Sequence, residues 1–438
     1  MPAKRLTILA IGSRGDVQPY VALGIGLQRA GYAVTLVAGD DFEPFITGYG
    51  LGFHPLGVNI GWYIEEKLYG AMGTGRNSPR ALREIVRTGL EFAPRMITNL
   101  RDACADADAI LAHIIGALMT FHLAEKWHKS FLLTLSFPLP GRTREVPNAT
   151  LPFGDPLDGS TPGPLRSRVN LFTHQLTEAL LWGMIWGPAN HWRGQEGLPP
   201  LPLWRWPLDR LNGASRPIPA VYGYSPLVLP HPADWGPHQH VCGYWTLPLP
   251  ADWQPPADLA AFLAAGPPPV FVGFGSMSAR APLETARIAL DAVRRSGLRG
   301  IVQPYRPALE EVRALAGDDP NIFVLGSCPH EWLFPRMVAV AHHGGVGTTA
   351  AALRAGHPAV VVPFFGDQPF WAGRVRALGT ATEPIPRQAL TSERLAYALR
   401  VAATHQPMRQ RAEALGEKIR GEDGVSEAVR VINNYLRG

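Results

Sequence analysis

The stretch Val338–Arg374 decides the fold of this chain, and it reads VAVAHHGGVGTTAAALRAGHPAVVVPFFGDQPFWAGR. Its first residues, Val338–Ala341, form a short apolar run that is typical of a buried strand. A glycine-rich turn with two histidines follows over residues 342–347. Glycines let backbone N–H groups approach an anion closely. We therefore interpret this turn as a phosphate cradle.

The residues after the turn predict a helix and a second strand. Thr348-Thr349 are placed to cap a helix over Ala350–Arg354, and Gly356 is placed to end it. His357–Phe365 reads as the returning strand, which runs into the polar loop 366–369. The stretch is thus a strand–turn–helix–strand unit, and its helix N-terminus adds partial positive charge to the cradle.

The N-terminal half repeats this unit. Leu6–Ile11 reads as a strand and residues 12–16 as a turn, while Pro19 suits the first turn of a helix that Gly31 ends. Ala33–Ala38 is the next strand, so a doubly wound parallel sheet is predicted. The other predicted elements are helices at Glu84–Ala103, Leu118–His128, Leu165–Trp192, Leu283–Arg295, Leu395–Ala403 and Glu427–Leu436, and strands at Ala109–Ala112, Phe131–Leu135, Ala220–Leu229, Pro269–Gly273, Gly300–Gln303 and Ile322–Val324.

Length and composition predict a folded chain of two α/β domains. The chain has 438 residues, of which 46% are hydrophobic and 18% charged, as in globular proteins. We predict a first domain over 1–230, a connection rich in Pro, Trp and His over 231–254, and a second domain over 255–415. Residues 416–438 are expected to form a C-terminal helix that packs back towards the first domain.

Charge and cysteine content limit the expected partners and compartment. The net charge of +5 is dispersed, so nucleic acid is not an expected partner, while a pI of about 9.2 permits peripheral membrane contact. Cys104, Cys242 and Cys328 form no CxxC pair, which argues against a disulfide framework or zinc site and favours the cytoplasm. We expect no signal peptide and no membrane-spanning segment.

Two segments of the first half are candidates for a ligand site. Residues 138–163 are rich in Pro, Gly, Thr and Asn and read as a long loop, which is often functional. Several tryptophans crowd the helix and turn that follow, and they indicate either core packing or the wall of an apolar pocket. They are Trp182, Trp186, Trp192, Trp204 and Trp206.

The motifs of several other enzyme classes are missing. The chain has no GxxxxGK[ST], HExxH or GxSxG, so P-loop, zincin and α/β-hydrolase chemistry are not indicated. The first glycine turn does not match GxGxxG either. Asp40 and Asp41 do end the second strand, where a dinucleotide fold keeps its ribose acid, and this leaves an NAD enzyme as an alternative.

Five short motifs in order carry a family resemblance. They are GSRGDVQP at 12–19, FGSM at 274–277, CPHEWLFP at 328–335, HHGGVGTTAAALRAGHP at 342–358 and VPFFGDQPFWAGRV at 362–375. Together they resemble the nucleotide-sugar-dependent glycosyltransferases of family 1, which have the GT-B fold. The similarity extends over nearly the whole chain and is strongest to sterol glucosyltransferases and antibiotic-aglycone glycosyltransferases.

The resemblance implies two Rossmann-like doubly wound domains that face each other across a cleft. The first would bind a lipophilic acceptor alcohol such as a sterol, triterpenoid or polyketide, and the second a nucleotide sugar. The implied reaction is transfer of a hexose, glucose from UDP-glucose, with inversion and without a metal. The UDP-sugar is then a co-substrate, and no cofactor is expected. Two alternatives remain, a GT-B-fold epimerase and a non-catalytic sugar-nucleotide-binding protein.

The resemblance also assigns catalytic and acceptor residues. Asp16 matches the catalytic base, although the same residue is also explained as a cap of the following helix. His113 falls near the position of a partner for that base, and an ordinary histidine at the end of a strand is the alternative. Arg14, Trp182 and Trp186 are the expected acceptor contacts.

The donor residues follow from the second half of the chain. Ser327 stands where plant members carry a tryptophan that stacks on the nucleobase, which leaves uracil and thymine as alternatives. His342 is expected to be structural. The expected contacts are His343, Gly345, Gly347, Thr348 and Thr349 for the diphosphate, Ser276 as a second phosphate contact, Asp367 and Gln368 for the sugar hydroxyls, and Pro329 and His330 for the nucleobase.

Overall fold

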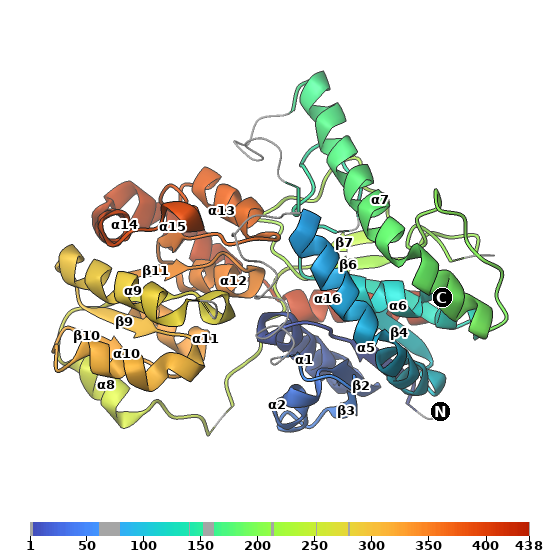
Figure 1. Ribbon diagram of the computed structural model, residues 1–438, viewed down its shortest axis with the longest axis horizontal. Helices are drawn as coiled ribbons and strands as arrows, with labels where there is room; N and C mark the ends of the chain where they lie inside the picture. Colours follow the sequence, from blue (N-terminus) through green and yellow to red (C-terminus); the bar gives the residue numbers. More distant parts are fainter. Residues whose placement is uncertain are drawn as a thin grey trace.

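Two parallel sheets, each flanked by helices, form the protein (Figure 1). This computed structural model describes residues 3–60, 79–139, 141–151, 162–211, 214–250, 252–278 and 281–437, without the side chains of 79–90. In this part of the chain, the first sheet has the strand order β3-β2-β1-β4-β5-β6-β7 and the second β10-β9-β8-β11-β12. Every strand pairing is parallel, which confirms the predicted doubly wound α/β class.

The first domain alternates strands and helices as the apolar periodicity predicts. Its β1 pairs with β2 on one side and with β4 on the other, so β1 lies near the middle of the sheet. The strands are β1 (Arg5–Leu9), β2 (Ala33–Ala38), β3 (Gly52–Pro55), β4 (Ala109–Ala112), β5 (Ser130–Leu135), β6 (Ala220–Tyr222) and β7 (Gln239–Val241), and the helices are α1 (Arg14–Arg29), α2 (Glu43–Thr47), α5 (Pro79–Ala105), α6 (Ile114–Lys126) and α7 (Pro164–Gln195).

The second domain is built in the same way. Its β8 is the central strand, paired with β9 and β11. The strands are β8 (Val270–Gly273), β9 (Gly300–Gln303), β10 (Ile322–Val324), β11 (Ala339–His342) and β12 (Ala359–Val361), and the helices are α8 (Ala257–Ala264), α9 (Pro282–Ser296), α10 (Leu309–Ala316), α11 (His330–Leu333), α12 (Val346–Ala355), α13 (Gln368–Ala377), α14 (Ser392–Thr404), α15 (Gln406–Arg420) and α16 (Gly424–Arg437).

Two helices begin earlier than the sequence predicts. Helix α1 begins at Arg14 rather than near Pro19, because Ser13 and Asp16 form a capping box at its N-terminus. Helix α12 begins at Val346 with Gly345 as its N-cap, so Thr348 and Thr349 lie inside the helix instead of capping it. Gly356 ends α12 with a φ of 79°, as predicted.

Two differences concern the edge of the first sheet. The strand predicted over Ala220–Leu229 ends at Tyr222, since the chain turns at Ser225 and Pro226 has no N–H for a ladder. The segment predicted as a connection over 231–254 contains β7, which pairs with β6. A strand of three residues between prolines carries too little pattern to be recognised in the sequence.

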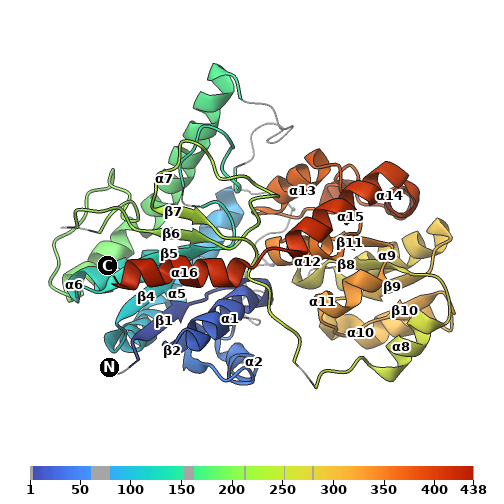
Figure 2. The same cartoon turned by 180° about the vertical axis from the view of Figure 1, so that it is seen from behind.

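The last helix crosses from the second domain to the first (Figure 2). Helix α16 lies beside α1, and its buried side chains join the apolar cluster of β1 and α1. The approach is close, since a Cβ at Gly26 would lie 2.4 Å from Cγ1 of Val425. At the start of α16, a Cβ at Gly424 would lie 2.4 Å from the carbonyl carbon of Gly243.

The two domains also share an apolar core. One cluster contains Tyr224 and Val228 of the first domain together with Phe370, Trp371 and Val375 of α13. The rings of Tyr224 and Trp371 meet edge to face, with centroids 6.0 Å apart. Because this contact is buried and apolar, it holds α13 against the first domain.

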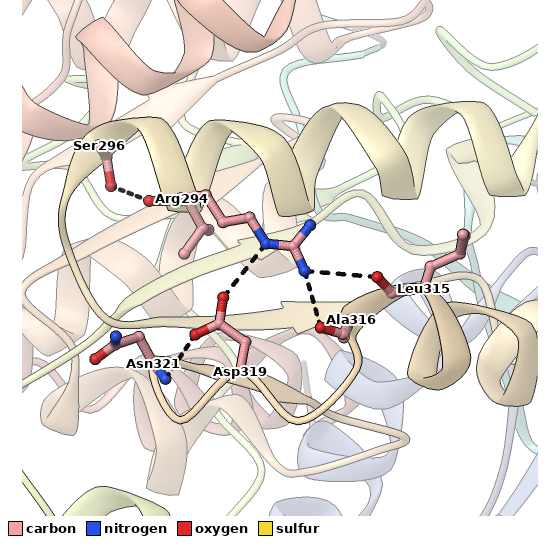
Figure 3. A network of polar contacts seen from close by, with 7 residues as sticks. Arg294, Ser296, Leu315, Ala316, Asp319 and Asn321 are labelled. Carbon is pink, nitrogen blue, oxygen red and sulfur yellow. Dashed lines mark hydrogen bonds and ion pairs between the residues drawn. The ribbon is translucent and has the colours of Figure 1, made fainter.

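Polar contacts fasten helices within the second domain (Figure 3). Arg294 lies in the last turn of α9 and donates to the carbonyl of Ala316 at 2.8 Å, at the C-terminal end of α10. The same guanidinium bonds to Asp319 at 3.3 Å, and Asp319 accepts from the N–H of Asn321 at 3.0 Å. A cation therefore satisfies a terminal helix carbonyl, as the helix dipole favours.

A substitution at Gly424 tests the docking of α16. Gly424→Ala should lower the free energy of unfolding, measured with urea, by about 1–3 kcal/mol, because the added methyl group collides with the backbone of Gly243 and Tyr244. Gly187→Ala is the matched control, since a Cβ there meets no described atom within 4 Å. It should stabilise α7 by roughly 0.5–1 kcal/mol. Equal behaviour of both variants would contradict this packing.

Candidate active site

A cavity of about 1600 Å³ lies between the two domains and receives side chains from both. Its wall combines the turn before α1 with the loops at the carboxyl ends of β8, β11 and β12, as open α/β sheets favour. Four of the predicted site residues do not line it, namely His113, Thr349, Trp182 and Trp186. Those that do are Arg14, Asp16, Ser276, Pro329, His330, His343, Gly345, Gly347, Thr348, Asp367 and Gln368.

Asp16 is the third residue of α1, and its carboxylate is held in a fixed orientation. Oδ2 accepts the backbone N–H of Ser13 at 2.8 Å and the Ser13 hydroxyl at 2.9 Å. Oδ1 has no hydrogen-bond partner among the described residues. Gly12 is required beside it, since a Cβ there would lie 2.4 Å from Oδ2 and the φ is 154°. Capping thus uses one carboxylate oxygen and leaves the other for chemistry.

His113 lies behind the cavity wall rather than on it. The residue precedes α6, and its ring contacts Tyr20 and Phe137 edge to face at 6.4 and 5.9 Å. The ring is 5% exposed, and neither nitrogen has a hydrogen-bond partner in the described part of the chain. Burial lowers the pKa of His113, and the negative charge of Asp16 acts in the opposite direction. The imidazole is therefore neutral and close enough to sense Asp16.

The two histidines of the glycine turn have different roles. His342 is buried, and its Nδ1 accepts the N–H of Gly344 at 3.0 Å, which agrees with a structural role. His343 lines the cavity, and a Cβ at Gly345 would lie only 2.5 Å from its Nε2. Burial lowers the pKa of His343 to about 4, so the ring is neutral at neutral pH. Glycine at 345 therefore makes room for the imidazole at the start of α12.

Two helix N-termini meet at the cavity. Helices α1 and α12 begin at Arg14 and Val346, and a Cβ at Gly347 would lie 3.7 Å from the carbonyl oxygen of Gly15. Thr348 lines the cavity, whereas Thr349, the other threonine predicted to contact the diphosphate, is 1% exposed and does not line it. The exposed end of α12 offers backbone N–H groups and positive potential to an anion.

Asp367 and Gln368 begin α13 at the opposite side of the glycine turn. Trp371 donates its indole N–H to Oδ2 of Asp367 at 2.8 Å, and burial raises the pKa of Asp367 to about 7. The side-chain oxygen Oε1 of Gln368 accepts the backbone N–H of Phe364 at 2.8 Å. These bonds fix both side chains at the cavity wall, where they present one carboxyl and one amide N–H₂.

Ser276 and His330 both line the cavity. Ser276 lies in a short 3-10 helix after β8, and α9 has a different N-cap, so Ser276 is not that cap. His330 stacks on Phe334 with ring centroids 4.3 Å apart, and Pro329 is the N-cap of α11. Burial lowers the pKa of His330 to about 4. Both residues border the same cavity.

Sequence reasoning missed three charged residues of the wall, Arg306, Glu331 and Arg354. Burial raises the pKa of Glu331, while the charges of Arg354 and Arg14 lower it. Glu331 lies inside the quoted CPHEWLFP motif, directly after His330. Arg354 lies about two helical turns after Gly347, so both residues share one face of α12. Following this face from the glycine turn would have identified Arg354.

The apolar wall comes from α7, but from another face than predicted. Leu181, Met184, Ile185 and Trp192 line the cavity. Trp182 is 2% exposed in the core. Trp186 faces outward and donates to the carbonyl of Leu201 at 2.8 Å, so neither predicted acceptor tryptophan reaches the cavity. Residues 140 and 152–161 of the predicted acceptor loop lie outside the described residues.

The described residues contain no group of three or more His, Cys, Asp or Glu side chains arranged to hold a metal ion. None of their helices combines the length and apolar character that crossing a bilayer requires. The three cysteines are free and buried.

Asp367→Asn should stabilise the protein more at about pH 8 than at about pH 5. The pKa of Asp367 lies above its ordinary value of 3.8, so ionisation is costly in the folded state, and this cost grows as the pH rises towards about 7. The difference in the gain should be roughly 1–3 kcal/mol, measured by urea unfolding. Asp318→Asn, on an exposed turn of the same domain, is the control. A gain that does not depend on pH would contradict the raised pKa.

Comparisons with known proteins agree with this geometry. The model of the glycosyltransferase family 28 N-terminal domain matches residues 6–126, and that of the erythromycin biosynthesis protein CIII-like C-terminal domain matches residues 302–433. Among solved structures, the glycotransferase of kitacinnamycin has a TM-score of 0.68 at 20% identity and covers 99% of both chains. A spinosyn rhamnosyltransferase complexed with spinosyn aglycone has a TM-score of 0.65 at 20% identity and covers 98% of this chain and 100% of its own. These likenesses confirm the GT-B fold.

Curated relatives are more similar in sequence. The sterol 3-beta-glucosyltransferase UGT80A2 of Arabidopsis thaliana is 33% identical over 100% of this chain, which spans 66% of that relative. A sterol 3-beta-glucosyltransferase of Cryptococcus neoformans is 33% identical, and the chain spans 27% of it. O-mycaminosyltylonolide 6-deoxyallosyltransferase of Streptomyces fradiae is 34% identical, with 98% of this chain and 97% of the relative covered. By this full-length similarity, the chain belongs to the glycosyltransferase family that contains the sterol and antibiotic glycosyltransferases.

Proposed function

We propose that this protein transfers a hexose, glucose from UDP-glucose, to a hydroxyl of a lipophilic alcohol, with inversion and without a metal. The observation that carries the proposal is the large cavity between the domains. It brings the carboxylate of Asp16 together with the N-terminus of α12 and with Asp367. A base, an anion site and a sugar-binding carboxyl are the parts that this transfer requires.

The second domain would bind the nucleotide sugar. The backbone N–H groups at the start of α12, with Thr348, Ser276 and the imidazole of His343, would hold the diphosphate, since these residues line the same cavity. Asp367 and Gln368 would bind sugar hydroxyls, since a carboxyl and an amide can both accept and donate hydrogen bonds. Pro329 and His330 border the same cavity and would face the nucleobase.

In the first domain, Asp16 would act as general base. Its Oδ1 takes the proton of the acceptor hydroxyl while that oxygen attacks the anomeric carbon. The bond from this carbon to the diphosphate oxygen breaks, and the nucleoside diphosphate leaves with the electron pair. Helix α12 and His343 then stabilise the negative charge that develops. His113 would act on Asp16 only through space from behind the wall, since neither of its ring nitrogens has a hydrogen-bond partner among the described residues.

The acceptor is proposed to be lipophilic because its side of the cavity is apolar. Leu181, Met184 and Ile185 of α7 face it, and Leu118 and Met119 of α6 continue the wall. Arg14 would contact the acceptor near the base. Similar relatives are named as sterol 3-beta-glucosyltransferases, which supports both glucose and a sterol-like alcohol. Three of the similar solved structures are complexes with thymidine diphosphate or DTDP, so TDP-glucose is the donor to compare.

Asp16→Asn tests the proposed base. We expect transfer to fall by roughly 10²–10⁴-fold, measured as glycoside formed from UDP-glucose and a panel of hydrophobic alcohols. The carbonyl oxygen of Asn can still accept from Ser13, so folding and the affinity for UDP should stay near those of the parent protein. Near-normal turnover of the variant would exclude Asp16 as the base.

The parent protein also distinguishes the alternative functions. If UDP-glucose is converted to another nucleotide sugar without any alcohol, the protein is an epimerase. If no glycoside forms from UDP-glucose or TDP-glucose with any alcohol, the transferase proposal is wrong.

His343→Ala should weaken UDP binding about tenfold, because the variant loses an imidazole beside the diphosphate. Isothermal titration with UDP and TDP measures this loss and also ranks the two nucleobases. His357→Ala is the matched control, since His357 belongs to the same domain and lies outside the cavity. Unchanged UDP affinity in His343→Ala would move the phosphate site elsewhere.

A further inference from the structure

The outward face of α7 is apolar, which is unusual for a helix at the surface. Leu165, Val169, Phe172, Leu176 and Leu180 recur at intervals of three or four residues and so form one stripe. The side chains of Leu165 and Phe172 are 76% and 55% exposed. Figure 1 shows the N-terminal end of α7 standing out from the first domain, so this stripe lies on a projecting element. A soluble monomer rarely leaves such a surface open.

The exposed apolar side chains of the described residues concentrate at this place. Of the ten large hydrophobic residues that are exposed, seven lie on α7 or on the loop after it. That loop is tied to α7, because Trp186 and Asn190 both donate to the carbonyl of Leu201. The seven are Leu165, Val169, Phe172, Leu180, Trp186, Leu203 and Trp204. We call this set of residues the α7 surface.

The charged residues near the start of α7 itself are positive. Arg166 and Arg168 lie in the first turns of the helix. The only acidic residue of α7 is Glu178, which is buried and paired with Arg142 at 2.6 Å. The outward face therefore presents no carboxylate. An apolar face with tryptophans and flanking arginines is the composition of a helix that lies in the interface of an anionic bilayer.

We propose that the α7 surface docks the protein on an anionic lipid bilayer. The inner side of the same helix supports this occupant, since Leu181, Met184 and Ile185 line the cavity one turn away from Leu180. A lipophilic alcohol in the bilayer would then reach the cavity along α7 without crossing water. This last step rests on the proposed function, whereas docking itself does not.

The test is co-sedimentation of the full chain with vesicles of phosphatidylcholine mixed with phosphatidylserine, without donor or acceptor. The parent protein should sediment with these vesicles, and less with phosphatidylcholine alone. The double variant Leu165→Ser/Phe172→Ser should lose on the order of a hundredfold in partition coefficient, because two large apolar side chains no longer insert. Both positions are exposed, so its circular dichroism and melting temperature should match those of the parent.

The matched control is Tyr397→Ser. Tyr397 is 64% exposed and lies on α14 of the second domain, away from the α7 surface, so vesicle binding should not change. The proposal is overturned if the parent protein stays in the supernatant, or if the double variant binds vesicles as well as the parent. It is also overturned if light scattering shows a dimer that the double variant dissociates, because a second copy would then cover α7.

Docking and catalysis can fail separately. Transfer to a detergent-dispersed alcohol should persist in the double variant, since neither substituted residue lines the cavity. If the parent protein binds vesicles but glycosylates nothing, the docking surface stands and the proposed function is wrong.

Discussion

The whole arrangement depends on the packing of α1, which contacts the second domain at both of its ends. Its C-terminal half packs so closely against α16 that there is no room for a side chain at Gly26 beside Val425. Its N-terminus meets α12, where Gly347 approaches the carbonyl of Gly15. With both ends fixed, the carboxyl edges of the two sheets face one another, and the cavity lies between them.

The same interface couples the proposed sugar site to the first domain. Asp367 is held by the indole of Trp371, and that indole packs against Tyr224 across the interface. The guanidinium of Arg374, one turn further on α13, donates to the carbonyl of Val228. The carboxyl that would bind the sugar is thus oriented by residues whose own packing requires the domains to be associated. A base from one domain and a donor site from the other can act together only in this state.

Local chemistry made much of this predictable from the sequence. A glycine-rich turn before an apolar helix indicates where backbone donors can face a ligand, and this pattern predicted that Gly345 and Gly347 lie at the cavity. The sequence did not predict which face of α7 turns towards the cavity. Apolar residues occur on several faces of this helix, so its rotation about its own axis depends on what packs against it. Leu181 therefore lines the cavity where Trp182 was expected. The turn at Pro226 and the short β7 depend likewise on tertiary pairing, which leaves little trace in composition.

Electrostatics explains why so few fixed charges are needed on the donor side. Burial lowers the pKa of His343 to about 4 and of His330 to about 4, so both rings are neutral before a ligand arrives. A diphosphate beside α12 would raise the pKa of His343, since a nearby negative charge favours the imidazolium. The leaving group carries more charge than the bound donor, so this stabilisation would grow as the glycosidic bond breaks. In the proposed reaction, an imidazole that is neutral at first and gains a proton as this charge develops would favour the transition state over the ground state.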